Sequence, residues 1–457
     1  MDTSLFSEFP KITKNDWIAQ VTKDLKGKNF EETLVWQTLE NFEVQPYYSE
    51  EDLQNLPIAN IQAAQKNKNS ASWQNRAYIK YNTEKEVNVL IINYLQRGVS
   101  SVVIDFGNTD VKKVDWVKLL NNVKLSDNPV FFKTPYREQA LEQLTKIVHY
   151  LPKGGFQVDV LAELFLNDEP TLSNYTWENT KQILSKTLQF SQFSAFTVES
   201  HVFHNAGANT AQELAFTLAS AVEYIDKLTD LGLTPEQVIS KFEFSVSIGT
   251  NYFMEVAKLR ALRYLWSKVL EAYSCTSLIK DCQIHCQTSS FYNSTLSPYT
   301  NMLRATTEAM SAVLGGCDAL TITAYDAVLK NEISADFGER IAQNMAILMK
   351  EEAHLDKTID PSAGSYYIES LTYQLATEAW GLFQKVESLG GILAAFEKGF
   401  VQEEVDKSYK ANVNRLNEGK VMVGVNKFRV EPENTSPKIE KVKTSKLKNR
   451  RLSEVFE

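Results

Sequence analysis

The run KFEFSVSIGTNYFMEVAKLRALRYLWSKVL, residues 241–270, decides the fold class. Its first eight residues are rich in aromatic and β-branched side chains, which is typical of a buried strand. Apolar residues at helical spacing follow over 253–270, and a second apolar run, LIKDCQIHCQT, comes next at 278–288. A strand, a helix and another strand in this order predict one unit of a parallel sheet.

The same alternation continues on both sides of this unit, with further helices expected at 212–228 and 337–348. The seven candidate strands lie at 99–106, 129–134, 156–161, 193–200, 241–248, 278–288 and 318–325. Strands alternating with helices over about 250 residues predict an α/β fold, a (β/α)8 TIM-type barrel, although the eighth strand is not evident. A doubly wound open sheet is the alternative, and the lack of a G-x-G-x-x-G run after any strand argues against it.

Changes in composition divide the chain into three segments. Residues 1–75 are expected to form an N-terminal arm and connector, 76–430 the barrel with a helical C-terminal extension, and 431–457 a basic linker or tail. Between 438 and 451 the tail carries seven Lys or Arg and one acid. A solvated tail is the simplest interpretation, and a docking segment for an acidic partner is the alternative.

The arm itself is expected to be amphipathic. Trp17, Val21 and Leu25 are at helical spacing, and Trp36 follows in an extended apolar patch. This apolar face has no obvious cover before the barrel begins, so we expect it to wrap a partner protein. Residues 50–75 are polar and lack periodicity, which predicts an irregular connector.

The overall composition excludes several classes of protein. Of 457 residues, 43% are hydrophobic and 23% charged, and the 48 basic against 57 acidic side chains give a net charge of −9, which argues against a general nucleic-acid binder. No apolar run approaches the ~20 residues needed to span a bilayer, and no secretory signal is visible. The four cysteines are no disulfide framework. We therefore expect a cytoplasmic protein with no nucleic-acid or membrane partner.

In a barrel, reactive groups belong at the carboxyl ends of the strands. The polar residues expected there are Asp105, Lys133, Glu199, His201, Gln287, Thr288, Tyr325 and Asp326. No nucleophile elbow, phosphate loop or H-E-x-x-H helix accompanies them. These residues alone therefore indicate a large barrel with an acyl or sugar substrate and no defined reaction.

Two histidine and cysteine groupings could suggest a metal. His201 and His204 are three apart just after a strand, and are more simply loop histidines or substrate contacts. Cys282 and Cys286 would share one face of a strand and His285 the other, which favours core packing of the cysteines. No metal site is expected.

One basic helix face could hold a phosphate. It comprises Lys258, Arg260 and Arg263, at the spacing of a single helix side. A solvated or ion-paired face is the simpler interpretation of such a group.

Five segments, in order, resemble the acyl-CoA mutase domain of the adenosylcobalamin-dependent methylmalonyl-CoA mutase family. They are Trp17…KDLKG…LVW, NYFMEVAKLRALRYLW (251–266), HCQTSS (285–290), ADFGERIAQN (335–344) and DPSAGSYYIESL (360–371). The resemblance implies a barrel that works with adenosylcobalamin on an acyl-CoA. Among the matching positions, Tyr78, Gln287 and Glu369 are the candidate binding residues.

This chain departs from the family pattern at positions that take part in catalysis in the family. Where catalytic chains read G-Y-H-M-Q-E-A-G-A, this chain reads SHVFHNAGA, so Val202 stands at the histidine that would hydrogen-bond the thioester carbonyl. An imidazole can polarise a carbonyl and an isopropyl group cannot. Likewise, residues 321–323 read Thr-Ile-Thr where catalytic chains have H-T-N. Ser290 stands where they have a glycine, and Gln283 where they have an arginine. We expect no catalytic residue in this chain.

Two further family features are missing from the sequence. The D-x-H-x-x-G run of the cobalamin-binding domain does not occur, so no such domain is expected, and only Arg76 and Tyr78 match the end of the segment that lines the CoA tunnel. The pattern resembles the family's small, non-catalytic subunit. Its large partner would bind adenosylcobalamin and interconvert (R)-methylmalonyl-CoA and succinyl-CoA, and this chain would bind no cofactor tightly. The alternatives are a catalytic barrel served by a separate cobalamin-binding chain, and a free-standing homodimer without enzymatic activity.

Overall fold

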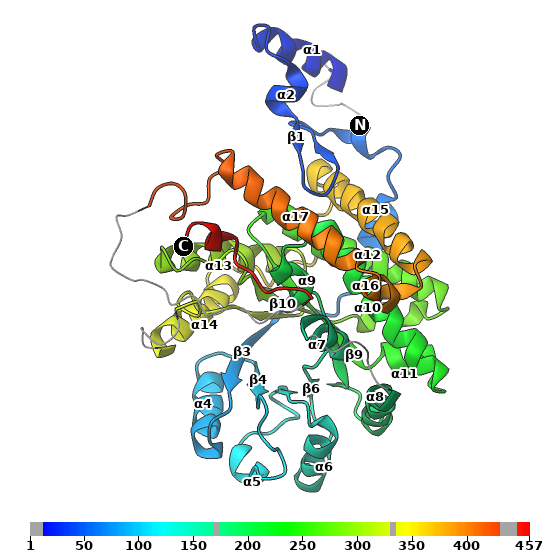
Figure 1. Cartoon of the computed structure of the whole chain (residues 1–457), viewed down its shortest axis with the longest axis vertical. Coiled ribbons are helices and arrows are strands. Elements are labelled where there is room, and N and C mark those ends of the chain that lie inside the picture. The colour runs from blue at the N-terminus through cyan, green and yellow to red at the C-terminus, as the bar shows by residue number, and fades with distance from the viewer. Residues whose placement is uncertain (1–11, 168–173, 330–334, 430–445) are drawn as a thin grey trace, which may run out of the picture.

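A computed structural model describes residues 12–167, 174–329, 335–429 and 446–457. Its main sheet is parallel, with the strand order β7-β6-β5-β4-β3-β11-β10-β9-β8. Strand β7 (Phe193–Ser194) pairs with β6, and β8 (Phe196–Glu199) pairs with β9. Only Ala195 separates β7 from β8, so one stretch of chain closes the sheet, and the predicted TIM-type barrel is confirmed (Figure 1).

The other strands of the barrel are β3 (Gln74–Lys80), β4 (Ser101–Asp105), β5 (Val130–Lys133), β6 (Gly154–Phe156), β9 (Phe242–Ile248), β10 (Ile284–Thr288) and β11 (Ala319–Thr321). The strand missing from the sequence prediction is β3, which pairs with β4 and β11. Its sequence has no continuous apolar pattern, because Arg76, Tyr78 and Lys80 interrupt its apolar residues. Arg76 nevertheless points inward, where a buried carboxylate neutralises it.

Two predicted strand boundaries are wrong for local reasons. Strand β6 ends at Phe156, because Asp159 caps helix α7 (Val160–Leu166) by accepting hydrogen bonds from the first turn. It begins at Gly154, where a Cβ atom would lie 1.9 Å from the Val130 carbonyl oxygen, so a glycine-rich strand was not recognised. Residues 276–281 form a 3-10 turn, η2 (Thr276–Asp281), and β10 starts only after it.

Helices surround the barrel. They are α4 (Glu84–Gln96), α5 (Trp116–Leu119), α6 (Arg137–Ile147), α8 (Asn174–Thr187), α9 (His201–Ala206), α10 (Thr210–Asp230), α11 (Pro235–Ile239), α12 (Tyr252–Ala272), α13 (Pro298–Leu314) and α14 (Ala335–Glu351). The C-terminal extension adds α15 (Tyr366–Ser388), α16 (Gly391–Glu397) and α17 (Phe400–Asn417). Because α15 and α16 pack outside α10 and α12, those two helices are buried on nearly every side (Figure 1).

The basic face of α12 is ion-paired within the fold. Lys258 Nζ lies 3.0 Å from Glu213, Arg260 Nε 2.8 Å from Asp360, and Arg263 Nη2 2.5 Å from Asp318. A buried cation is tolerated only with such partners. The ion-paired interpretation of this face is therefore confirmed.

The expected irregular connector contains regular structure. It forms a 3-10 turn, η1 (Glu50–Leu53), and a helix, α3 (Ile58–Lys66), which packs against α12. Gln65 Nε2 donates to the Arg260 carbonyl oxygen, and Lys68 Nζ to that of Cys317. Polar side chains that bond buried backbone groups hid this helix from an apolar-pattern search.

The N-terminal arm stands away from the barrel (Figure 1). It consists of α1 (Lys14–Asp24), α2 (Phe30–Leu34) and a hairpin of β1 (Trp36–Gln37) and β2 (Glu43–Val44). No side chain of α1 or α2 is buried, and Trp17 contacts the rings of Tyr47 and Phe30, both in the arm, at 4.9 and 6.3 Å between ring centroids. Trp36 is 39% exposed, so the arm has an aromatic surface without full cover in this chain.

Part of the basic tail is packed rather than solvated. Residues 430–445 lie outside the described residues, but 446–457, which we call the C-terminal strap, run over the carboxyl-end mouth of the barrel and include η3 (Leu452–Val455) (Figure 1). For the strap, the interpretation as a solvated tail is wrong. The segment division at 75 and 430 stays a prediction. Among the described helices, none combines the length and apolarity that crossing a bilayer requires.

Candidate functional site

A cavity of about 420 Å³ opens at the carboxyl ends of the strands. The strand-end residues predicted to gather there that do line it are Lys133, Glu199, His201, Gln287 and Thr288. Asp105 lies behind them, accepting a hydrogen bond from the hydroxyl of Tyr78, which also lines the cavity. Tyr325 and Asp326 lie apart from it: Tyr325 stacks on Tyr299, at 5.4 Å between ring centroids.

The three candidate binding residues do not come together. Tyr78 and Gln287 line the cavity, whereas Glu369 is fully buried on α15, outside the barrel. Glu369 accepts hydrogen bonds of 3.0 Å from Arg260 and 2.8 Å from Gln62. Its geometry is that of a structural anchor between helices.

A hydrogen-bonded belt runs from helix α9 across strands β9, β10 and β11 beside the cavity. The two ring nitrogens of His201 lie 2.7 Å from Ser247 Oγ and 2.8 Å from Ser245 Oγ. Ser245 Oγ also contacts Nδ1 of His285, whose Nε2 lies 2.9 Å from Thr321 Oγ1. Burial lowers the pKa of His201 to about 3 and that of His285 well below its usual value, so both imidazoles are neutral. The ring nitrogens of both histidines therefore bond side chains of the barrel and are not available to a ligand.

Val202 occupies the place where the family motif has its histidine. It is the second residue of α9, is 3% exposed, and presents its side chain to the cavity. The neighbouring His201 does reach the cavity wall, but both of its ring nitrogens are already bonded. A thioester placed here would therefore find no free imidazole donor.

The barrel axis below the belt is filled. Arg76 of β3 and Glu243 of β9 form a bidentate ion pair across the interior, with contacts of 2.6 and 3.1 Å. The Arg76 guanidinium also lies 3.7 Å from the centroid of the Phe131 ring. All three side chains are buried. A long pantetheine chain passing along this axis would have to displace a buried, charge-neutral pair.

Glu199 and Asp159 are carboxyl groups with raised pKa values near the cavity. Burial raises the pKa of Glu199 to about 7, while Lys133 acts in the opposite direction. Burial also raises the pKa of Asp159 to about 6, although it accepts hydrogen bonds from Tyr224 and from backbone amides. Perturbed groups of this kind in a cleft mark a candidate site. Sequence reasoning could place Glu199 at a strand end but could not foresee its burial.

His204 belongs to a second cluster. Its Nδ1 lies 3.1 Å from Glu213 and its Nε2 2.6 Å from Ser289 Oγ. Burial alone would raise the pKa of Glu213, but Lys258 and His204 lower it to about 2. A serine, a histidine and a carboxylate in line resemble a hydrolase triad. Ser289 is only 1% exposed and does not line the cavity, so no substrate reaches it, and the cluster holds α9 to the barrel.

The cysteines pack in the core as free thiols. Cys282 and Cys286 are buried, and His285 turns instead toward the barrel interior. Across the described part of the chain, no group of three or more His, Cys, Asp or Glu side chains is placed to hold a metal ion. The packing prediction for the cysteines holds.

The C-terminal strap covers the mouth of the cavity. Its backbone amides donate to carbonyl oxygens that follow three barrel strands: Leu447 to Phe165, Arg450 to Asn205 and Leu452 to Phe291. The Arg450 guanidinium lies 3.1 Å from Asp406 and 4.2 Å from the Tyr409 ring centroid, and Asn449 lines the cavity.

These residues do not fit adenosylcobalamin. A corrin ring over the mouth would need an open face, and the strap lies there instead. His201 and His285, the histidines beneath it, have both nitrogens bonded within the barrel. No step of chemistry through that cofactor follows from this site.

A TIM barrel with a polar cavity at its carboxyl end and an appended arm is the architecture expected of the acyl-CoA mutase class. The family model for methylmalonyl-CoA mutase matches residues 141–457. The chain belongs to the methylmalonyl-CoA mutase family.

Two small subunits are among its relatives. The methylmalonyl-CoA mutase small subunit of Porphyromonas gingivalis is 34% identical over 93% of this chain and 71% of its own length. The small subunit of Streptomyces virginiae is 28% identical, over 90% of this chain and 70% of its own. The resemblance to small subunits is therefore confirmed.

Other matches are more distant or partial. Methylmalonyl-CoA mutase of Escherichia coli is 30% identical over 93% of this chain, which spans 65% of that protein's length. Among solved structures, a fructose-bisphosphate aldolase from Plasmodium falciparum aligns over 73% of this chain and 96% of its own, at 10% identity. Its TM-score of 0.29 carries no argument.

Proposed function

We propose that this chain is the small, non-catalytic subunit of a cytoplasmic methylmalonyl-CoA mutase heterodimer and stabilises the large catalytic subunit. The observation that carries the proposal is Val202, a buried aliphatic side chain where the chemistry needs a hydrogen-bond donor. The Arg76–Glu243 pair supports it, because it fills the axis along which an acyl-CoA would lie.

The partner would hold adenosylcobalamin and carry out the isomerisation. In support of this, the strap covers the mouth of this barrel, and the arm exposes aromatic side chains that suit a protein interface. A pair of subunits that diverged from one ancestor commonly keeps a related two-fold interface. This chain would then contribute packing surface to the complex.

Co-expression with the large subunit from the same organism tests this proposal. The two chains should co-elute as a 1:1 complex on gel filtration, and the large subunit should lose activity when expressed alone. Full activity of the large subunit without this chain would contradict a stabilising role. A stable, monodisperse dimer of this chain alone would favour the homodimer alternative.

A further inference from the structure

The function proposed above gives no role to the side chain of Glu199. It ends β8, its side chain lines the cavity, and among the described residues its carboxylate has one hydrogen bond, a 3.4 Å contact from Thr197 Oγ1. Glu199 is partly buried, and a carboxylate withdrawn from water without strong donors is costly to the fold. Such a group is retained at low cost only when something else supplies the donor.

A second polar group on the same wall also lacks a partner. Gln157 follows β6, lines the cavity and is 6% exposed, yet its Oε1 accepts no hydrogen bond within the described structure. Buried side-chain oxygens are bonded in the great majority of cases. Two acceptors therefore line one cavity, and among the described residues neither has an adequate donor.

The charges around the cavity favour a cation. Arg76 is neutralised by Glu243, and His201 is neutral. Lys133, the nearest cation to Glu199, lies 3.8 Å from Asp105 and is shared with it. Acids outnumber bases among these groups, so an anion such as a carboxylic acid would be repelled.

We propose that the cavity binds a small organic amine, with its ammonium group on Glu199 and a second donor reaching Gln157. The volume of about 420 Å³ is within the range of small-molecule sites. Asn449 of the strap would close over the bound molecule. This binding does not depend on the subunit role and would differ from the acyl-CoA chemistry of the family.

Three four-carbon probes, one cationic, one neutral and one anionic, test the proposal by calorimetric titration of the full chain at pH 7.5. We expect 1,4-diaminobutane to bind at least tenfold more tightly than 1,4-butanediol, and succinate not to bind. Equal affinity for all three, preference for succinate, or no binding of the diamine at millimolar concentration would overturn it.

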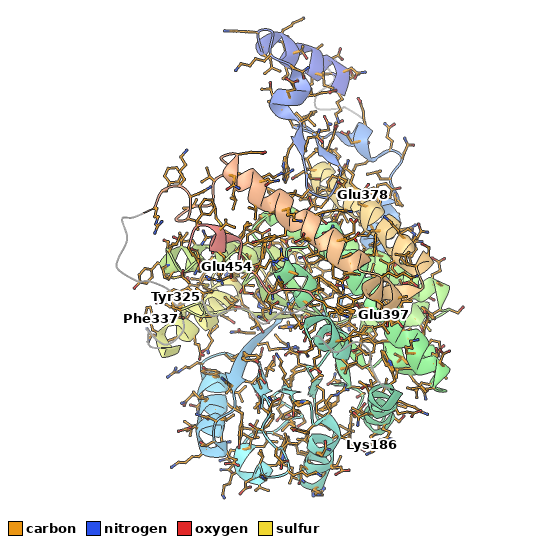
Figure 2. All side chains as sticks on the ribbon, viewed as in Figure 1. Lys186, Tyr325, Phe337, Glu378, Glu397 and Glu454 are labelled. Carbon is orange, nitrogen blue, oxygen red and sulfur yellow. The ribbon has the colours of Figure 1, made fainter. Side chains whose placement is uncertain are left out.

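Variants then locate the binding. Glu199→Gln should weaken the diamine at least tenfold, whereas Glu397→Gln on the exposed surface of α16 (Figure 2) should leave its affinity unchanged. Gln157→Leu keeps every charge and should weaken binding of the diamine severalfold. This variant tests the proposal if circular dichroism shows that Glu199→Gln does not fold. Unchanged affinity in a folded Glu199→Gln variant would place the amine elsewhere.

Discussion

Val202 and His201 stand side by side at the start of α9, and neither can serve a thioester. Val202 has no hydrogen-bond donor, and both ring nitrogens of His201 are already hydrogen-bonded to Ser245 and Ser247. Restoring one histidine does not clear the Arg76–Glu243 pair from the axis or the strap from the mouth. Val202→His in the isolated chain should therefore show no turnover of methylmalonyl-CoA in a coupled assay with added adenosylcobalamin. Measurable turnover would mean that the remaining site is far more complete than its geometry indicates.

Glu199 gives the fold a pH dependence of defined sign. Its pKa is about 7 when folded and near 4.5 when unfolded, so between these values the folded state holds a proton that the unfolded state lacks. This contribution is fully present below about pH 4.5 and is lost as the pH rises through about 7. The groups that face it are Lys133 on β5, and Asp159 and Glu163 at α7.

Urea unfolding from pH 5 to 8 measures this contribution. The unmodified chain should lose stability relative to Glu199→Gln as the pH rises, by up to about 1.4 kcal/mol per unit. Using the difference between the two proteins removes the similar trend from Asp159, which both retain. A difference that stays constant with pH would contradict the raised pKa of Glu199.

At the scale of elements, one cation and one apolar side chain are among the groups that hold the strap, beside Leu447, Ser453 and its backbone amides. Arg450 bonds Asp406, and Leu452 packs in a small cluster with Phe291. Replacing both by alanine should release the strap, because truncating a buried leucine alone costs about 2–5 kcal/mol locally. Trypsin should then cleave the strap much faster, as followed by mass spectrometry. Lys448→Ala, at an exposed position, is the control and should cleave no faster than the unmodified strap.

The arm is the other element with an exposed role. Deleting residues 1–36 should abolish co-purification with the large subunit while the far-ultraviolet circular dichroism of the barrel stays helical. The reason is that α1 and α2 bury no side chain, so their removal takes little from the core. Assembly of a fully active complex by the truncated chain would move the interface to the barrel helices.

The elements show what a sequence can and cannot predict. The helices at α10, α12 and α14 followed from apolar spacing, since one face of each meets the barrel. Strand β3 and helix α3 were missed, because their polar residues point inward to bonds with distant partners such as Glu243. The site could be predicted only in part. The strand-end position of Glu199 follows from the sequence, but only the fold shows that Gln157 lines the same cavity and that Glu369 does not.

For the whole molecule, the barrel keeps the scaffold of the family, and in the role we propose its interior takes no part in acyl-CoA chemistry. Buried ion pairs and a histidine belt fill the space below the cavity, and the strap closes the space above it. In the proposed complex, this chain would contribute packing surface and its exposed arm. The central claim is therefore that cofactor and chemistry reside in the partner.

The number of adenosylcobalamin sites in the isolated chain and in the heterodimer tests that claim most directly. Absorbance titration of this chain alone with adenosylcobalamin, and of the purified heterodimer beside it, gives the number of sites in each. We predict no binding to the isolated chain in the low micromolar range and one cobalamin per heterodimer. Low-micromolar binding by the isolated chain, or two cobalamins per heterodimer, would contradict the non-catalytic assignment.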